Sequence, residues 1–221
     1  MNETFDKGIA FVFEGDTEKY FYVNLLQFIC SKYEGFSFEE KDDVVGGTYV
    51  IEGNEKSIIV RINTVGTITQ MVHSGNWFNN TCASKYSSKM PWDVFLCYDT
   101  DSHTGDISKF QENDWKRLRE NISRRKNIHV FDMAASAEIE DVFLMDLENI
   151  SIYLNAPNVL SETDIPYGRT GKAKLRSLFR SFGKTYHEGK RALDLINVLD
   201  KQKLIDSGIL PLVQIETSIT K

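Results

Sequence analysis

Three acidic side chains stand directly after two apolar segments of this chain. Glu14 follows the segment Ile9–Phe13, and Asp99 and Asp101 follow the segment Asp93–Tyr98. If the two segments lie side by side, three carboxylates converge, and acids that close cannot all stay ionised without a cation. Carboxylate oxygens without a His or Cys partner favour a hard ion, so the pattern predicts a site for Mg²⁺ or Mn²⁺.

Positioning these acids requires both segments to be neighbouring strands of one sheet. Each reads as a fully buried strand, because apolar residues dominate it without alternation. In open α/β sheets, sites form beyond the carboxyl ends of the strands. Gly15 would let the backbone turn sharply after Glu14 and leave room for a bulky substrate.

Strands and helices alternate along the chain, which predicts an α/β fold with a mostly parallel sheet flanked by helices. The hydrophobic pattern indicates further strands at about 44–51, 57–63 and 128–133. It also indicates helices at about 17–33, 67–74, 111–125, 138–147, 172–182 and 189–201, and loops at 76–90 and 155–169.

The length of 221 residues is long for one domain and short for two. We expect an α/β core over residues 1–150, with an insertion at about 35–90, and a basic helical extension over residues 151–221 that packs on the core. Three cysteines without paired spacing argue against disulfides and zinc. No signal or membrane-spanning pattern is present, so we expect a soluble cytoplasmic protein with no membrane partner.

The net charge of −6 argues against a general DNA coat protein but is compatible with a nuclease whose acids hold metal. The glutamate–glycine pair after the first strand and the Asp-x-Asp after a later strand resemble the TOPRIM fold shared by topoisomerases, primases and several nucleases. Four segments of this chain more specifically resemble RloB-like and OLD-type TOPRIM proteins. These segments are FVFEGDTEKYFY, WDVFLCYDTDSH, MAASAEIEDVFLMDL and KLRSLFRSFGKTYHEGKRALDLINVLD. The resemblance covers most of the chain in patches, with gaps at about 35–90 and 148–168.

This resemblance implies a metal-dependent nuclease. Glu14 would act as metal ligand or general acid–base, and Asp99 and Asp101 would hold the first Mg²⁺ or Mn²⁺ ion. Further acids would complete a second metal site, for which Glu18 and Glu140 are favoured among the candidates Glu18, Glu138, Glu140 and Asp141. Two ions would stabilise the attacking and leaving oxygens of an in-line displacement at phosphorus. Without a gate domain or an ATPase motif, topoisomerase activity is not expected.

A basic stretch near the C-terminal end is the predicted contact to nucleic acid. Lys172, Arg176 and Arg180 lie four residues apart and share one helix face, where the alternative is a solvated surface. The full set of predicted nucleic-acid contacts is Lys172, Lys174, Arg176, Arg180 and Lys184. Lys172 is also a candidate catalytic residue, because it could neutralise the charge that develops at phosphorus.

RloB-like proteins are associated with phage-resistance loci, often beside an ATPase. The resemblance therefore implies an antiviral defence effector, acting in abortive infection, within an oligomer or a complex with a separate ATPase chain. The target could be DNA or RNA. The alternative is a Mg²⁺-binding regulatory or partner-docking module without nuclease activity, in which the basic helix docks a protein.

Overall fold

The computed structural model describes residues 4–41, 47–100, 112–135, 138–168 and 170–221 and contains one six-stranded sheet. The order across the sheet is β2 (Ser37–Glu40), β3 (Thr48–Gly53), β4 (Lys56–Thr64), β1 (Lys7–Phe13), β5 (Trp92–Asp99) and β6 (Ile128–Ala135). β1 pairs in parallel with β4 and β5, and β5 with β6, whereas the β2–β3 and β3–β4 pairs are antiparallel. The predicted α/β fold with a mostly parallel sheet is confirmed.

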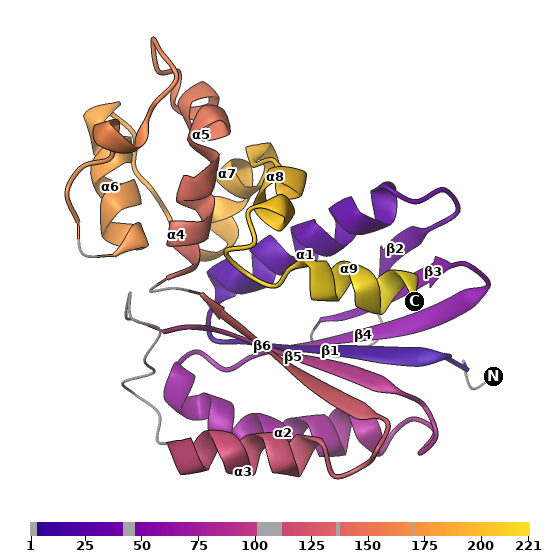
Figure 1. Cartoon of the computed structure of the whole chain (residues 1–221). Coiled ribbons are helices and arrows are strands. Elements are labelled where there is room, and N and C mark those ends of the chain that lie inside the picture. The colour runs from indigo at the N-terminus through magenta and orange to yellow at the C-terminus, as the bar shows by residue number, and fades with distance from the viewer. Residues whose placement is uncertain (1–3, 42–46, 101–111, 136–137, 169) are drawn as a thin grey trace.

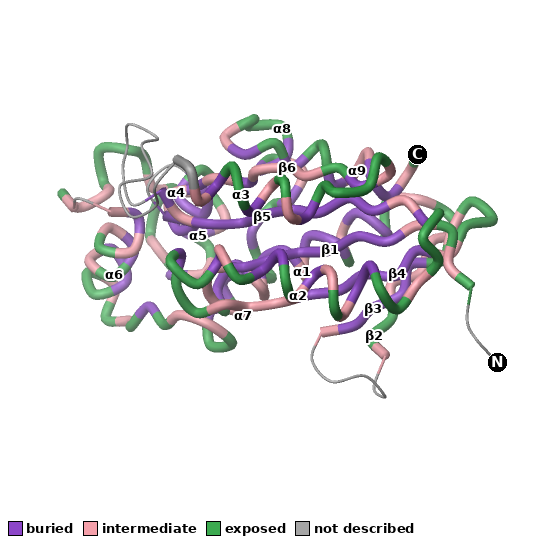
Figure 2. Tube along the Cα trace, turned by 90° about the horizontal axis from the view of Figure 1, so that it is seen from below, coloured by how far each residue is buried: buried purple, intermediate pink, exposed green. Residues whose placement is uncertain are grey.

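Helices cover both faces of this sheet (Figure 1). As a result, β1 and β5 are buried along nearly their whole length (Figure 2). Successive side chains of β1 point to opposite faces. Phe11 and Phe13 join the cluster beneath α1 (Asp16–Ser31), and Val12 joins the cluster on the face of α2 (Ser74–Phe78) and α3 (Glu112–Ile122). The two apolar runs predicted as buried strands therefore form the centre of the molecule.

The chain after β6 forms short helices beside the carboxyl edge of the sheet and on the α1 face (Figure 1). Their hydrophobic side chains belong to the same buried cluster as those of α1 and β1. In chain order they are α4 (Ile139–Phe143), η3 (Leu144–Asp146), α5 (Leu147–Leu154), η4 (Glu162–Asp164), α6 (Gly171–Ser181), η5 (Gly189–Ala192), α7 (Leu193–Val198), α8 (Lys201–Asp206) and α9 (Val213–Thr220). Within the described ranges, no helix is long and apolar enough to cross a membrane.

The interval 35–90 supplies β2, β3 and β4. β4 pairs with β1 from Lys7 opposite Ile58 to Phe13 opposite Thr64. This part of the interval predicted as an insertion is thus integral to the sheet, because it provides the neighbour that β1 needs on one side.

The loop predicted at 76–90 is wrong in its first half. After η1 (Ile68–His73), helix α2 continues into the π-helical turn η2 (Asn79–Ala83). Phe78 and Cys82, one helical turn apart, are fully buried on the α3 face of the sheet, and the Asn79 amide donates to the backbone oxygen of Asn121 at 3.2 Å. The polar residues between Phe78 and Cys82 hide this spacing in the sequence.

The helix predicted at 138–147 is divided into α4, η3 and the start of α5. The helix predicted at 189–201 is likewise divided, because Leu199 adopts an extended conformation with ψ 138° between α7 and α8. Helix α9 was not predicted. Short, irregular helices of this kind carry little periodic signal.

Candidate functional site

A cavity of about 420 Å³ opens where β1 and β5 end and α1 and α4 begin. Its walls carry four of the acids singled out in the sequence, together with a lysine and two further acids. These residues are Glu14, Glu18, Asp99, Glu140, Lys172, Asp16 and Glu188. Residues from positions 14 to 189 thus meet at the carboxyl edge of the sheet, which is where α/β folds place their sites.

Parallel pairing of β1 with β5 brings Glu14 and Asp99 together. The backbone N–H of Glu14 donates to the carbonyl oxygen of Cys97 at 3.1 Å, which extends the ladder one residue past the strand. The backbone N–H of Asp99 in turn donates to Glu14 Oε2 at 3.2 Å. The Asp99 carboxylate accepts from the backbone N–H of Ile139 at 2.8 Å, so the start of α4 is held against the same point.

Glu18 folds back over the first turn of α1 towards Gly15. A Cβ atom at Gly15 would lie 2.9 Å from Glu18 Oε2, so a side chain there would displace the carboxylate. The backbone of Gly15 is extended, with φ −135°, so the glycine serves this close approach rather than an unusual turn. Glu18 is only 5% exposed, and its carboxylate therefore faces the cavity rather than bulk water.

The carboxylates raise one another's pKa. Burial is the largest cause for both Glu18 and Asp99, and repulsion from Glu14 and Glu140 raises their pKa values further. Burial also raises the pKa of Glu140, although Lys172 and a hydrogen bond from Tyr186 oppose it. A cluster in which burial and like charge both penalise ionisation is one that a bound cation would stabilise.

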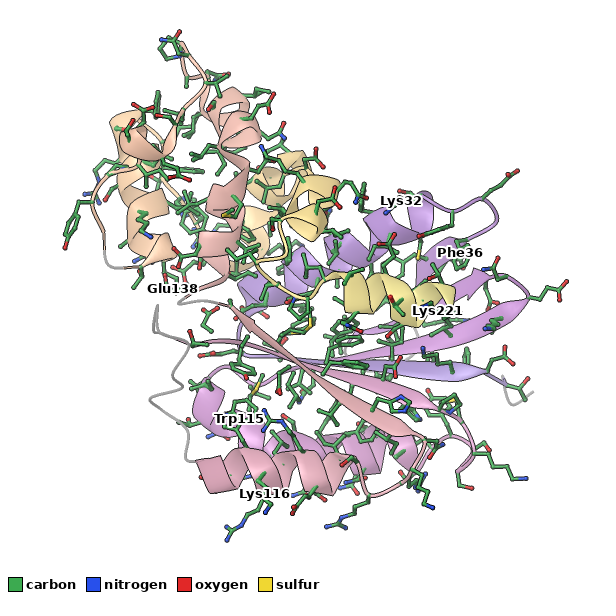
Figure 3. All side chains as sticks on the ribbon, viewed as in Figure 1. Lys32, Phe36, Trp115, Lys116, Glu138 and Lys221 are labelled. Carbon is green, nitrogen blue, oxygen red and sulfur yellow. The ribbon has the colours of Figure 1, made fainter. Side chains whose placement is uncertain are left out.

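Three acids follow β6, and the structure gives them different surroundings. Glu138, labelled in Figure 3 where the chain leaves the sheet, accepts from the backbone N–H of Lys172 at 2.7 Å. Asp141 accepts from the backbone N–H of Gly171 at 3.1 Å and pairs with Lys174 Nζ at 3.0 Å. Glu138 and Asp141 thus satisfy the first amides of α6, and Glu140 alone of the three lines the cavity.

Lys172 reaches the cavity because α6 begins directly on α4. A Cβ atom at Gly171 would lie 2.3 Å from the backbone nitrogen of Asp141, so only glycine allows this contact. Lys172 Nζ lies 3.2 Å from Glu188 Oε2. Burial opposes its charge, but Glu140 and Glu188 outweigh this effect and raise the pKa of Lys172. The side chain is therefore a protonated ammonium in the cavity wall.

Two contacts that hold the site together are not among the sequence predictions. The Tyr186 hydroxyl donates to Glu140 Oε1 at 2.8 Å, and Thr17 Oγ1 accepts from the backbone N–H of Gly189 at 2.9 Å. Both contacts fix the segment 184–189 against the acids. The signal available was the single acid, Glu188, within a basic stretch, but no periodicity places this segment at the sheet edge.

The predicted nucleic-acid contacts do not all face the acidic cavity. Lys172 lines it, whereas Arg176, Arg180 and Lys184 line a neighbouring cavity. Lys174 is engaged by Asp141, and Arg176 by Glu188. Lys184 Nζ donates to the backbone oxygen of Tyr153 and lies 4.7 Å from the Tyr153 ring centroid. Arg180 is exposed on α6. Asp101, predicted as a metal ligand, lies outside the described residues.

The donor set fits a hard divalent cation, because every candidate ligand at the cavity is a carboxylate. Glu140 Oε2 is buried and has no hydrogen-bond partner among the described residues, which leaves one oxygen that a cation would satisfy. Across the described ranges, no three His, Cys, Asp or Glu side chains are already grouped closely enough to hold a metal ion. Coordination would therefore require side-chain rotation that draws these carboxylates together.

No family model matches this chain, and no curated protein matches it. Among solved structures it is similar to the native structure of futalosine hydrolase of Helicobacter pylori strain 26695. The identity is 12%, the match covers 92% of this chain and 95% of that chain, and the TM-score is 0.27. A likeness at that TM-score carries no argument about activity, so the functional proposal rests on the residues themselves.

Proposed function

We propose that this protein is a metal-dependent nuclease of the TOPRIM type that hydrolyses phosphodiester bonds of DNA or RNA. The observation that carries the proposal is the meeting of Glu14, Glu18, Asp99 and Glu140 with Lys172 in one cavity. The four acids come from the ends of two parallel strands and the starts of two helices. Such an arrangement serves chemistry better than structure, because burial and mutual repulsion make it costly to keep.

Glu14, Glu18, Asp99 and Glu140 would hold Mg²⁺ or Mn²⁺, as one ion or two. The bound cation would supply charge neutralisation at phosphorus and a more acidic water. Glu14 lines the open cavity and is therefore placed to accept a proton from an attacking water. That Asp101 supplies a further ligand to the metal stays a prediction.

Lys172 would stabilise the negative charge that develops on the phosphate oxygens. Its ammonium lies in the wall of the same cavity and is held by Glu188 at 3.2 Å. A preorganised cation of this kind contributes more in a partly buried site than in water. The substrate phosphate would compete with Glu188 for this ammonium.

The expected defence role, the ATPase partner and the oligomeric assembly rest on the sequence resemblance. They stay predictions alongside the chemical proposal. A regulatory module that holds Mg²⁺ without cutting nucleic acid is the competing function, and the same experiment separates the two.

The test is cleavage of supercoiled DNA, linear DNA and a structured RNA pool in Mg²⁺, Mn²⁺ or EDTA. Wild type is compared with Glu14→Gln and Asp99→Asn, which keep side-chain shape and remove charge. The control is Glu120→Gln, an exposed acid on α3 across the sheet. We expect metal-dependent cutting by wild type and the control and none by the other two variants.

Equal cutting by all four proteins would overturn the assignment of the site. Mg²⁺ binding by wild type without cutting of any substrate would favour the regulatory module. Circular dichroism of each variant shows whether a loss of cutting comes from the site or from misfolding.

A further inference from the structure

A second cavity, of about 360 Å³, lies beside the acidic one and has the opposite charge. Its walls are formed by Arg176, Arg180, Lys184, Thr185 and Tyr186, from α6 and the segment that follows it. Three of these five residues are cations, and none is acidic. The cavity is therefore built for an anion, in a chain whose net charge is −6.

Tyr186 separates this cavity from the acids. Its side chain lines the basic cavity, while its hydroxyl donates to Glu140 Oε1 in the acidic one at 2.8 Å. Glu188 makes a second connection, since it pairs with Arg176 on one side and with Lys172 Nζ on the other. A group bound among the cations is thus adjacent to the proposed catalytic residues.

The three cations are engaged to different degrees. Arg176 is balanced by Glu188, and Lys184 is held by the Tyr153 carbonyl and ring. The guanidinium of Arg180 forms no hydrogen bond or ion pair with any residue that the structure describes, and the side chain is exposed. Counting Glu188 against the three cations leaves a net charge of about +2 at the cavity.

We infer that this cavity binds a terminal phosphate monoester of a nucleic-acid strand. An internal phosphodiester carries one negative charge, whereas a monoester carries about −1.5 to −2 near pH 7 and presents three strong acceptor oxygens. The monoester therefore matches the cavity's charge and its guanidinium donors better. The inference rests on the proposed nuclease and adds that the enzyme recognises phosphorylated strand ends.

The experiment measures binding of one short single-stranded oligonucleotide with a 5′-phosphate, a 3′-phosphate or hydroxyl groups at both ends. Fluorescence anisotropy in EDTA keeps cleavage out of the measurement. We expect wild type to bind one phosphorylated form about tenfold more tightly than the hydroxyl form. The two phosphorylated forms tell which end is recognised.

Arg180→Gln should bring this ratio close to one, and Arg117→Gln, an exposed arginine on α3, should leave it unchanged. The ratio of the two affinities, for the phosphorylated and the hydroxyl-ended strand, is insensitive to a variant's weaker binding of internal nucleic-acid phosphates, because that weakening affects both strands equally. Equal affinity of wild type for all three strands, or a preference that survives in Arg180→Gln, would overturn the inference.

The outcome is distinguishable from failure of the proposed function. Metal-dependent cleavage without any preference for phosphorylated ends would leave the nuclease intact and remove the phosphate site. A preference that Arg180→Gln abolishes, in a protein that cuts no substrate, would support the phosphate site and remove the nuclease.

Discussion

Glu140 and Asp141 are neighbours in the sequence with opposite surroundings. Asp141 accepts a hydrogen bond from the backbone N–H of Gly171 and forms an ion pair with Lys174, so its carboxylate is compensated by groups of the fold itself. Glu140 is 1% exposed, and its Oε2 has no hydrogen-bond partner in the part of the chain that the structure describes. One residue therefore stabilises the junction of α4 and α6, and the other carries an uncompensated oxygen into the cavity.

The first prediction is that Asp141→Asn lowers the stability of the fold and Glu140→Gln does not. In EDTA, Glu140→Gln should not lower the free energy of unfolding, because it removes a buried and repelled carboxylate. Asp141→Asn should lower it by about 1–3 kcal/mol, since the ion pair with Lys174 is lost and the NH2 group cannot accept the hydrogen bonds of the oxygen that it replaces. Urea unfolding of both variants measures these changes.

Mn²⁺ titration supplies the matching functional readout. Glu140→Gln should weaken Mn²⁺ binding about tenfold or more, and Asp141→Asn should leave it close to wild type. The reverse pattern would mean that Asp141, rather than Glu140, faces the cation.

Lys172 gives the second prediction. Lys172→Gln should reduce kcat about 100- to 1,000-fold, the usual cost of removing one preorganised charge stabiliser. Mn²⁺ binding should not weaken, because the substitution removes a repelling cation from the cavity. The matched control is Lys116→Gln, an exposed lysine of α3 labelled in Figure 3. A reduced affinity for substrate with unchanged kcat would assign Lys172 to binding alone.

At the scale of elements, the site depends on how closely α6 approaches α4. Gly171 contacts the backbone of Asp141 at a distance that excludes a side chain. The amides of Gly171 and Lys172 are satisfied by Asp141 and Glu138 from the other helix. This junction carries Lys172 to the acids, so its packing controls the geometry of the cavity.

The third prediction is that Gly171→Ala destabilises the protein by about 1–3 kcal/mol and lowers activity, because the new methyl group must push α6 away. Gly168→Ala is the milder comparison, since its Cβ would lie 3.1 Å from Lys174 Cγ and 3.2 Å from the Lys174 backbone nitrogen, farther than the 2.3 Å approach at Gly171. Thermal unfolding and cleavage are measured on both. Stability of Gly171→Ala equal to that of wild type would contradict this account of the junction.

Asp146 connects η3 to the start of α8 and supplies the fourth prediction. Its fully buried carboxylate accepts from the backbone N–H of Asp200 at 2.7 Å and from Lys203 Nζ at 3.0 Å. Burial opposes its charge, but these bonds and one from Asn149 lower its pKa below the usual value of 3.8. A lowered folded-state pKa means stability that is complete at neutral pH and lost as pH falls through that pKa.

Asp146→Asn should therefore cost about 1–3 kcal/mol at neutral pH and much less below the folded-state pKa of Asp146. Urea unfolding across this range measures the difference. Glu148→Gln, an exposed acid beside the same lysine, is the control and should change stability by less than about 0.5 kcal/mol. A cost independent of pH would refute the charge-based account.

For the whole molecule, the sequence predicts the centre better than the periphery. The runs ending at Phe13 and Tyr98 are long, apolar and buried on both faces, so their parallel pairing and the meeting of Glu14 with Asp99 could be anticipated. Glu18 and Glu140, favoured through the family resemblance, also line the cavity. All four acids lie at the end of a strand or in the first turn of a helix, so they come close to the carboxyl edge of the sheet.

Tertiary packing determines what the sequence could not indicate. Lys174 carries the same charge as the other predicted phosphate contacts, yet the approach of α6 to α4 places it on Asp141. Tyr186 belongs to an irregular segment with no period, and its position follows from its bond to Glu140 and its packing against the Phe179 ring. The helical turn from Phe78 to Cys82 is not predicted, because the polar residues between them hide its period.

The most direct test of the central claim is hydrolysis of bis(p-nitrophenyl) phosphate, a minimal phosphodiester that needs neither a nucleic-acid surface nor a partner chain. Wild type, Asp99→Asn, Glu140→Gln and the control Glu120→Gln are assayed with Mn²⁺ and with EDTA. We predict p-nitrophenolate release with Mn²⁺ by wild type and the control alone, and none in EDTA. Equal rates in all four proteins, or no Mn²⁺-dependent release by wild type, would contradict a metal-dependent phosphodiesterase site.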